Sequence, residues 1–243
     1  MAILVTRPLP DGEATAAALR AKGFEVLLAP MLRFEPVAFQ DDRDTQYGAV
    51  VVTSANALRA IEARLVDSPL LKLPLFAVGE HTAQAARAAG FTKVVSAASD
   101  AAGLRERIVA SVKARTVKKT SPLLYLAGAD LARDLPGELG DRGFTVITQT
   151  AYRMVPITNL PDEVRKAFAA GGVDTVLHYS RRSARAFIEA VRAAGVEISA
   201  LSLRQCCLST AIATVVRDAG ASQVVVASSP EEGALFKALG EPI

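Results

Sequence analysis

The chain has 243 residues, 51% of them hydrophobic and 22% charged, so it can bury the cores of two α/β domains, and intrinsic disorder is excluded. Its net charge of +3 is spread along the sequence, and the short basic run at 112–119 lacks the interleaved aromatics of a nucleic-acid surface. No apolar run is long enough to span a membrane, and the N-terminus lacks the basic start of a secretory signal. We therefore expect a cytoplasmic protein that binds neither nucleic acid nor membrane.

Strands and helices are predicted to alternate along the chain. Continuous apolar runs, typical of parallel strands covered by helices on both faces, occur at 48–52, 74–78, 175–179 and 223–227. The segments between them carry apolar residues at helical spacing. Several of these helices are expected to end at a glycine, namely at Gly23, Gly90, Gly143 and Gly220. The pattern predicts doubly wound parallel sheets built from right-handed strand–helix–strand units.

The sequence also indicates an internal duplication. The matching segments are 3–36 with 123–156, 53–56 with 179–182, and 76–95 with 206–225. The first pair aligns without a gap, and the offset between the copies grows slowly along the chain. Matched segments that keep their order indicate that each half of the chain is one copy of the same unit.

Prolines mark where the chain is expected to pass between two domains. The segments 25–38 and 145–157 are too long for one ordinary strand, and both contain prolines, which favour edge or exit positions. We interpret each as a strand that leaves one domain and runs on as a connector. Residues 38–156 then form an inserted domain, and residues 1–37 with 157–243 form a discontinuous one. The ligand site is expected in the cleft between them.

Polar residues follow several predicted strands at the point where a helix begins. Capping of the helix is a sufficient reason for a hydroxyl there, since a cap contributes about 1 kcal/mol. The free N–H groups at a helix start, together with the hydroxyls, also make a carboxylate site, and a glycine allows close approach of a ligand. The candidates are Thr53, Ser54, Asn56, Gly79 and Thr82 in the first half, and Ser180, Ser209 and Thr210 in the second.

Two arginines are predicted to lie near these corners. Arg7 directly follows the first strand, and Arg133 lies in the first predicted helix of the second half. A guanidinium group at such a place could bind a carboxylate, and it could equally be a solvated surface group. Both interpretations stay open on the sequence alone.

Other chemistries find little support in the sequence. His81 and His178 are the only histidines, and no cysteine or carboxylate stands at metal-ligand spacing. A phosphate-binding loop, a dinucleotide fingerprint and a nucleophile elbow are all absent from the sequence. We expect His81 at a solvated helix start and His178 in a packed strand. The adjacent Cys206 and Cys207 are predicted to point to opposite faces of a strand, reduced and buried.

The motifs VTSANA, AVGEHTA, YLAGADLARDLP and TAYRMVP, in this order within the duplication, resemble those of uroporphyrinogen-III synthases. The resemblance covers nearly the whole chain and includes LVTRP at its start and SSPEEGALFKAL near its end. It implies two flavodoxin-like domains that cyclise hydroxymethylbilane to uroporphyrinogen III, with inversion of ring D and loss of water. It implies no metal or cofactor, a monomer, and a transient contact with the preceding pathway enzyme.

The resemblance also assigns roles to particular residues. Tyr152, in TAYRMVP, matches a tyrosine that donates a hydrogen bond to the departing hydroxyl, and a phenol is protonated at neutral pH. Gly128 lies in the matching YLAGAD segment and is a further binding candidate. The hydroxyl positions that match substrate contacts are those of Ser54, Thr82 and Ser180.

One segment departs from the family pattern. In CLSTAIA, Ser209 stands where the family usually has a glycine and Ile212 where it has a threonine, so Thr210 can substitute only if the loop shifts. This departure keeps open an alternative function, a non-catalytic two-domain sensor that closes on an anion. A flavin-binding protein of the same fold class is disfavoured, because no phosphate loop for the cofactor is recognisable.

Overall fold

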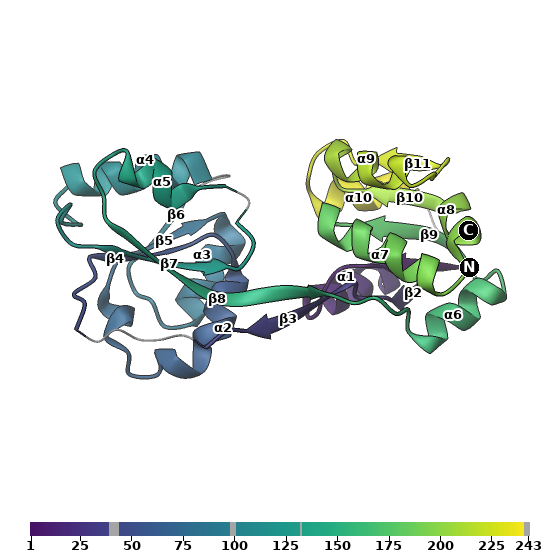
Figure 1. Cartoon of the computed structure of the whole chain (residues 1–243), viewed down its shortest axis with the longest axis horizontal. Coiled ribbons are helices and arrows are strands. Elements are labelled where there is room, and N and C mark those ends of the chain that lie inside the picture. Colours follow the sequence, from purple (N-terminus) through teal and green to yellow (C-terminus); the bar gives the residue numbers. More distant parts are fainter. Residues whose placement is uncertain (39–43, 98–100, 132, 241–243) are drawn as a thin grey trace. The chain divides into compact units, whose positions relative to one another are not determined.

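The computed structural model describes residues 1–38, 44–97, 101–131 and 133–240 (Figure 1). The chain divides into two compact units, the first made of residues 1–34 and 155–243 and the second of residues 35–154. Each unit is built on a sheet whose strands pair in parallel. The larger sheet also has an edge strand, β3 (Leu32–Pro36), which lies next to β8 (Val146–Pro156). The predicted α/β class with parallel sheets is confirmed.

The unit of residues 1–34 and 155–243 contains a five-stranded parallel sheet. Its strands are β1 (Ala2–Val5), β2 (Glu25–Leu28), β9 (Val173–His178), β10 (Arg204–Cys207) and β11 (Val224–Val226). They lie in the order β11-β10-β9-β1-β2. Its helices are α1 (Asp11–Arg20), α6 (Asp162–Ala169), α7 (Arg181–Ala193), α8 (Glu197–Ser202), α9 (Thr210–Asp218) and α10 (Glu232–Leu239).

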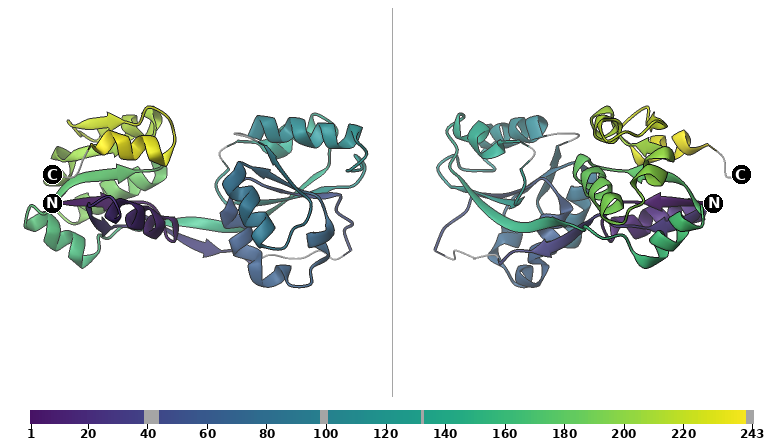
Figure 2. Two further views of the ribbon diagram at one scale, coloured as in Figure 1. Left: turned by 180° about the vertical axis from the view of Figure 1, so that it is seen from behind. Right: turned by 45° about the vertical axis from the view of Figure 1, so that its right-hand side comes forward.

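Helices cover both faces of this sheet. Helices α1 and α10 pack on one face, and the rear view in Figure 2 shows them in purple and yellow. Helices α7, α8 and α9 pack on the other face. Cys206 belongs to the first core cluster and Cys207 to the second, and both are free thiols, as predicted. Burial raises the pKa of Cys206 to about 11 and that of Cys207 to about 12.

The packed histidine predicted in this unit is confirmed. His178 is fully buried, and its Nε2 lies 2.9 Å from Oε1 of Gln205. Because the Gln205 amide nitrogen donates to two backbone carbonyls, its oxygen is the acceptor and the histidine proton sits on Nε2. Among the described residues, Nδ1 of His178 has no partner. Burial lowers the pKa of His178 to about 4, so the ring is neutral.

The unit of residues 35–154 contains a larger sheet, in which β8 lies next to the edge strand β3. Its strands are β4 (Ala49–Val52), β5 (Leu75–Val78), β6 (Val94–Ala97), β7 (Leu123–Gly128) and β8 (Val146–Pro156). The order is β3-β8-β7-β4-β5-β6, and β3 and β8 each run past the end of the unit along the chain. Its helices are α2 (Ala55–Leu65), the 3₁₀ helix η1 (Pro69–Lys72), α3 (Glu80–Ala88), α4 (Ala101–Lys113) and α5 (Leu135–Gly140).

The helices of this unit also form two layers (Figure 1). Helices α2 and α3 pack on one face of the sheet, with Ile61 and Ala86 fully or almost fully buried. Helices α4 and α5 pack on the other face through Ile108 and Leu139. The central strands β4 and β7 are therefore covered on both faces, which explains their continuous apolar sequences.

One predicted connector differs from the observed structure. Residues 25–38 do not form one long strand, because β2 ends at Leu28 and β3 begins at Leu32. The backbone N–H groups of Ala29 and Met31 bond to Val5 and Thr6, and Pro30, which has no N–H group, lies between them. Residues 146–156, in contrast, form one continuous strand, β8. Within the described residues, no helix combines the length and the apolar character needed to cross a membrane.

Candidate active site

A cavity of about 340 Å³ lies at the carboxyl ends of strands β4, β5 and β7 in the 35–154 unit. Its lining residues are Thr53, Ser54, Val78, Tyr125, Gly128, Asp130, Leu131, Arg133, Leu135 and Tyr152. Five residues that the sequence singled out are therefore brought together, namely Thr53, Ser54, Gly128, Arg133 and Tyr152. The carboxyl edge of a doubly wound sheet is where such folds hold their ligands.

The corner after β4 supplies two hydroxyls to the cavity. Ser54 has an extended backbone and is the N-cap of α2, and its Oγ accepts a hydrogen bond from the Asn56 backbone N–H at 3.2 Å. The Asn56 side chain instead accepts from Arg59 at 2.8 Å, and among the described residues Asn56 is not part of the lining. The capping interpretation of Ser54 is confirmed, and Ser54 also lines the cavity.

Tyr152 reaches the cavity through an irregularity in strand pairing. Between Ala127 and Gly128 the register of β7 against β8 shifts, so that Gly128 lies beside Tyr152. A Cβ atom at Gly128 would stand 2.8 Å from Cζ of the tyrosine and 2.9 Å from its hydroxyl oxygen. Gly128 is thus the residue that allows the phenol to lie across the strand, and the two candidates form one structural feature.

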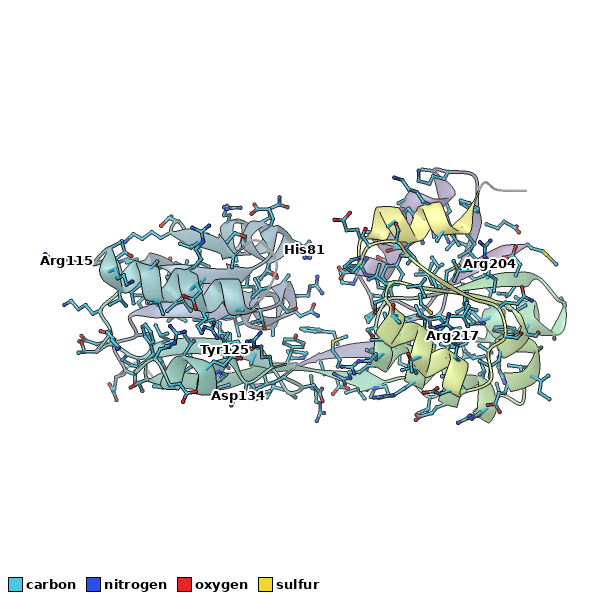
Figure 3. The ribbon with its side chains drawn as sticks, turned by 90° about the horizontal axis from the view of Figure 1, so that it is seen from above. His81, Arg115, Tyr125, Asp134, Arg204 and Arg217 are labelled. Carbon is cyan, nitrogen blue, oxygen red and sulfur yellow. The ribbon has the colours of Figure 1, made fainter. Side chains whose placement is uncertain are left out.

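Tyr125 is the functional candidate that sequence reasoning missed. It lies inside the 35–154 unit, where Figure 3 labels it, is 3% exposed, and lines the cavity beside Tyr152. Its hydroxyl is 3.2 Å from Oγ1 of Thr53. Burial is the main reason that the pKa of Tyr125 is raised, and the neighbouring Tyr152 raises it further. Thr53 lowers this pKa, because its hydroxyl can turn to donate to the phenol once the phenol is ionised. A tyrosine among the leucines of β7 was the available signal.

Arg133 lines the cavity from the segment that precedes α5. Asp134, labelled in Figure 3, caps α5 by accepting from the Gly137 N–H at 3.0 Å. The Arg133 guanidinium forms an ion pair with Glu138, and this contact holds the pKa of Glu138 below its usual range. Arg133 is about half exposed, and it precedes α5 rather than lying within it as the sequence suggested.

The corner after β5 is less directly part of this cavity. Gly79 has a φ of +75° and caps α3 without a side chain, so glycine is required there by the backbone. Thr82 is 5% exposed on α3. Among the described residues the lining includes neither of them, and only the preceding Val78 contributes. His81, labelled in Figure 3, is exposed in the first turn of α3, as predicted.

Arg7 belongs to the other unit, where it forms a polar cluster with nearby side chains. Its Nη1 donates to Glu232 at 3.0 Å and to Thr15 at 3.2 Å, and its Nη2 lies 3.4 Å from Asp11. The guanidinium also stacks 4.8 Å from the ring centre of Tyr179. The Tyr179 hydroxyl donates to Glu232 at 3.0 Å, and burial together with this carboxylate raises its pKa. Arg7 is therefore partly buried and held by side chains of its own unit, and its predicted role in ligand binding stays a prediction.

The remaining predicted residues lie at two helix starts of the same unit. Ser180 caps α7 by accepting from the Ser183 N–H at 3.0 Å. Ser209 is the N-cap of α9 but forms no side-chain cap bond, and Thr210 is exposed as the first residue of that helix. Ile212 is 4% exposed and packs in the core, which shows that this position faces the sheet.

The described residues offer no obvious metal centre. In the ranges that the structure describes, no group of three or more His, Cys, Asp or Glu side chains is placed to hold a metal ion. The buried His178 is bonded to Gln205, and His81 is exposed on α3. The polar groups at the cavity are instead hydroxyls, one carboxylate and one guanidinium.

The chain matches the family described as "Uroporphyrinogen-III synthase HemD" over residues 13–237. A search of curated proteins gave no significant match. Among solved structures, the chain is similar to uroporphyrinogen-III synthetase from Helicobacter pylori 26695, with a TM-score of 0.65, 16% identity, and coverage of 97% of this chain and 96% of that one. It is also similar to a mutant uroporphyrinogen III synthase from the extremely thermophilic bacterium Thermus thermophilus, with a TM-score of 0.58, 16% identity, and coverage of 98% and 97%. These likenesses show the fold, and the match over residues 13–237 shows that the chain belongs to the uroporphyrinogen-III synthase family, lyases of tetrapyrrole biosynthesis.

Proposed function

We propose that the chain cyclises hydroxymethylbilane to uroporphyrinogen III, and that the cavity at β4, β5 and β7 holds the reacting part of this substrate. The observation that carries the proposal is the position of Tyr152, whose side chain lines a cavity together with Thr53 and Ser54. Family membership supplies the reaction, and the cavity supplies a place for a proton donor beside hydrogen-bonding groups.

Tyr152 is proposed to assist the departure of the substrate hydroxyl. The carbon–oxygen bond breaks as the phenol gives its proton to the oxygen, which leaves as water. The substituted carbon of ring D bonds to the electron-poor carbon that remains, and this forms the spiro intermediate. The bond from ring D to its original neighbour then breaks and re-forms at the unsubstituted carbon of ring D, which loses a proton, and this proton restores the phenol. The contact between Tyr152 and Gly128 supports this role, because it fixes the direction in which the phenol can point.

The groups around Tyr152 are proposed to bind substrate carboxylates. Hydroxymethylbilane carries many carboxylates, and the start of α2 offers backbone N–H groups, a helix dipole and the hydroxyls of Thr53 and Ser54. Arg133 adds a guanidinium, which carboxylates bind well. The contributions of Asn56, Gly79 and Thr82, and of Arg7, Ser180, Ser209 and Thr210 in the other unit, stay predictions.

Positioning is proposed to matter more than strong acid or base chemistry. Hydroxymethylbilane can lose its hydroxyl and close without help, which gives the uninverted type I isomer. The enzyme must therefore hold the chain so that the substituted carbon of ring D is the one that attacks. Several moderate contacts spread over a cavity suit this task better than one strongly acidic group.

The two units are proposed to be duplicated flavodoxin-like domains. Counted along its own chain, the first unit has the strand order 2-1-3-4-5, which is the flavodoxin order. The second sheet has the same order if the edge strand β3 is left out and β7 and β8 are counted first. These two strands fall in the segment 123–156 that matches 3–36. The predicted boundaries at 37/38 and 156/157, and a site between the domains, stay predictions.

The proposal is tested by a coupled assay that generates hydroxymethylbilane in the presence of the purified protein. The products are oxidised, and the type I and type III isomers are separated by chromatography. We expect predominantly type III, with a reaction lacking the protein giving the type I background. Only type I from folded protein would overturn the proposal and make the anion-binding sensor the leading interpretation.

A further inference from the structure

A buried phenol stands directly behind one of the hydroxyls of the cavity. Tyr125 is 3% exposed, and its ring packs in the core cluster formed with Phe76, Leu104 and Leu135. A phenylalanine would fill the same space, so packing alone does not account for the hydroxyl. A hydroxyl buried at this depth needs a hydrogen-bond partner, and Tyr125 has one in Oγ1 of Thr53 at 3.2 Å.

The chemistry of the two groups sets the direction of this hydrogen bond. A phenol is more acidic than an aliphatic alcohol, so Tyr125 is the better donor and Thr53 the better acceptor. Burial, the largest influence on the Tyr125 pKa, raises it and keeps the phenol protonated near neutral pH. Once Thr53 Oγ1 accepts from Tyr125, the single proton of Thr53 must point elsewhere, and Thr53 lines the cavity.

A donor in this arrangement is both oriented and strengthened. A hydroxyl that accepts one hydrogen bond becomes a better donor in the next, because the bonds in a chain polarise one another. Helix α2 begins just after Thr53, and its positive end faces the same edge of the sheet, so a negatively charged ligand group is favoured there. The acceptor best suited to this hydroxyl is a carboxylate oxygen.

We propose that Tyr125 is a positioning residue for substrate binding, which donates to Oγ1 of Thr53 and thereby directs the Thr53 hydroxyl into the cavity to bind a carboxylate. The identity of that carboxylate, one of those on hydroxymethylbilane, rests on the proposed function. The relay from Tyr125 through Thr53 to a carboxylate rests only on the geometry of β4 and β7.

The test uses the full chain and the substitutions Tyr125→Phe and Thr53→Val, alone and combined. The matched control is Tyr47→Phe, because Tyr47 is also a buried tyrosine of the 35–154 unit, 8% exposed, but packs in the cluster on the other face of the sheet. Binding of the polycarboxylate uroporphyrin III is measured by titration, and KM and kcat are measured in the isomer assay. Thermal unfolding establishes that each variant is folded.

We expect Tyr125→Phe to raise the Kd for uroporphyrin III and the KM about fivefold, with little change in kcat, because one orienting hydrogen bond is lost. Thr53→Val is expected to raise both by about tenfold, since it removes the donor to a charged group. The double variant should be no worse than Thr53→Val, because Tyr125 acts through Thr53. Tyr47→Phe should leave Kd and KM unchanged.

Several outcomes would overturn the inference. An unchanged Kd in Tyr125→Phe would do so, as would effects that multiply in the double variant, or an equal loss of affinity in Tyr47→Phe. Failure of the wild-type chain to bind uroporphyrin III would also overturn it. If the wild type forms only the type I isomer while the Kd values follow the expected pattern, the proposed function fails and the relay stands.

Discussion

At the scale of the residue, Tyr152 is the side chain whose change should affect the reaction most. Replacing it by Phe removes the proposed donor to the departing hydroxyl and keeps the ring against Gly128. We expect kcat to fall by about 100-fold, a typical contribution of general acid catalysis, without complete loss of type III product. The measurement is the rate of type III formation, with the type I background subtracted.

Gly128 offers a second way to move the same phenol. In Gly128→Ala the new Cβ would stand 2.8 Å from Cζ of Tyr152, so the ring must shift although its hydroxyl is kept. A loss of rate comparable with that of Tyr152→Phe is the outcome consistent with a positioned donor. An unchanged rate of type III formation in both variants would show that Tyr152 has no role in the mechanism.

Ser54 provides a separate test of how substrate binding is distributed. Complete loss of activity in a folded Ser54→Ala protein would contradict binding through several moderate contacts.

His178 gives a pH-dependent contribution to stability. Its folded-state pKa of about 4 is below the value near 6.5 of an unperturbed histidine, so in acid the unfolded chain binds a proton that the folded chain does not. Its stability contribution is complete above pH 6.5 and is lost as the pH falls toward 4, by an amount on the order of 3 kcal/mol. Urea unfolding of the wild type and of His178→Leu between pH 7 and pH 4 measures this loss.

The difference between the two proteins isolates the histidine, because the carboxylates that also titrate in this range are common to both. We expect the free energy of unfolding of His178→Leu to fall less steeply with acid than that of the wild type. His81→Gln serves as the control, since His81 is exposed on α3. Parallel pH profiles for the wild type and His178→Leu would show that the buried ring is not the source.

The residues of the cavity differ in how far the sequence could predict them. Ser54 could be predicted because a hydroxyl that follows an apolar strand and precedes a helix is a recognisable helix cap. Tyr152 came from a motif, but its direction depends on a register shift between β7 and β8 that leaves no signature in local composition. From the sequence, Tyr125 is expected to be a core residue only. Its hydroxyl lies near Thr53 because β4 pairs with β7.

At the scale of the element, helix capping separates three serines that occupy equivalent places in the sequence. Ser54 and Ser180 accept from backbone N–H groups at the starts of α2 and α7, whereas Ser209 forms no side-chain cap bond at α9. We expect Ser54→Ala and Ser180→Ala each to lower the free energy of unfolding by about 1 kcal/mol. Ser209→Ala, the matched control, should cost clearly less, and equal losses for all three in chemical denaturation would contradict the capping interpretation.

The elements that were predicted and those that were missed have different physical origins. Strands β4, β5, β9 and β11 were recognisable because burial on both faces demands continuous apolar sequence. Helix α6 and helix α8 are short and were not anticipated. The division of residues 25–38 into β2 and β3 could not be predicted, because it depends on the strand beside each part. β2 pairs with β1, whereas β3 lies next to β8, and the sequence of residues 25–38 does not show these neighbours.

At the scale of the whole molecule, the 35–154 unit is expected to fold by itself. Its two ends are held together inside the unit by the Glu35–Arg153 ion pair at 2.7 Å and by the bond from the Val37 N–H to the Ala151 carbonyl at 2.8 Å. Both faces of its sheet are covered by its own helices. The excised segment should therefore show a helical and strand spectrum and unfold cooperatively in urea.

A substitution in the buried core tests whether the cooperative unfolding of the excised segment comes from its native packing. Ile61 is 1% exposed in α2, so Ile61→Ala in the excised segment should lower its free energy of unfolding by about 2–5 kcal/mol. Broad, non-cooperative unfolding of the excised segment, or insensitivity to the Ile61 change, would show that the unit depends on the rest of the chain.

The two adjacent thiols of β10 allow the opening of one unit to be followed by chemical labelling. Cys206 and Cys207 are the only cysteines, and they belong to core clusters on opposite faces of the same sheet. Residues 35–154 contain none, so a thiol-labelling reagent followed over time reports only on openings of the unit of residues 1–34 and 155–243. Mass spectrometry of which sulfur is modified first would then distinguish detachment of α1 and α10 from detachment of α7, α8 and α9.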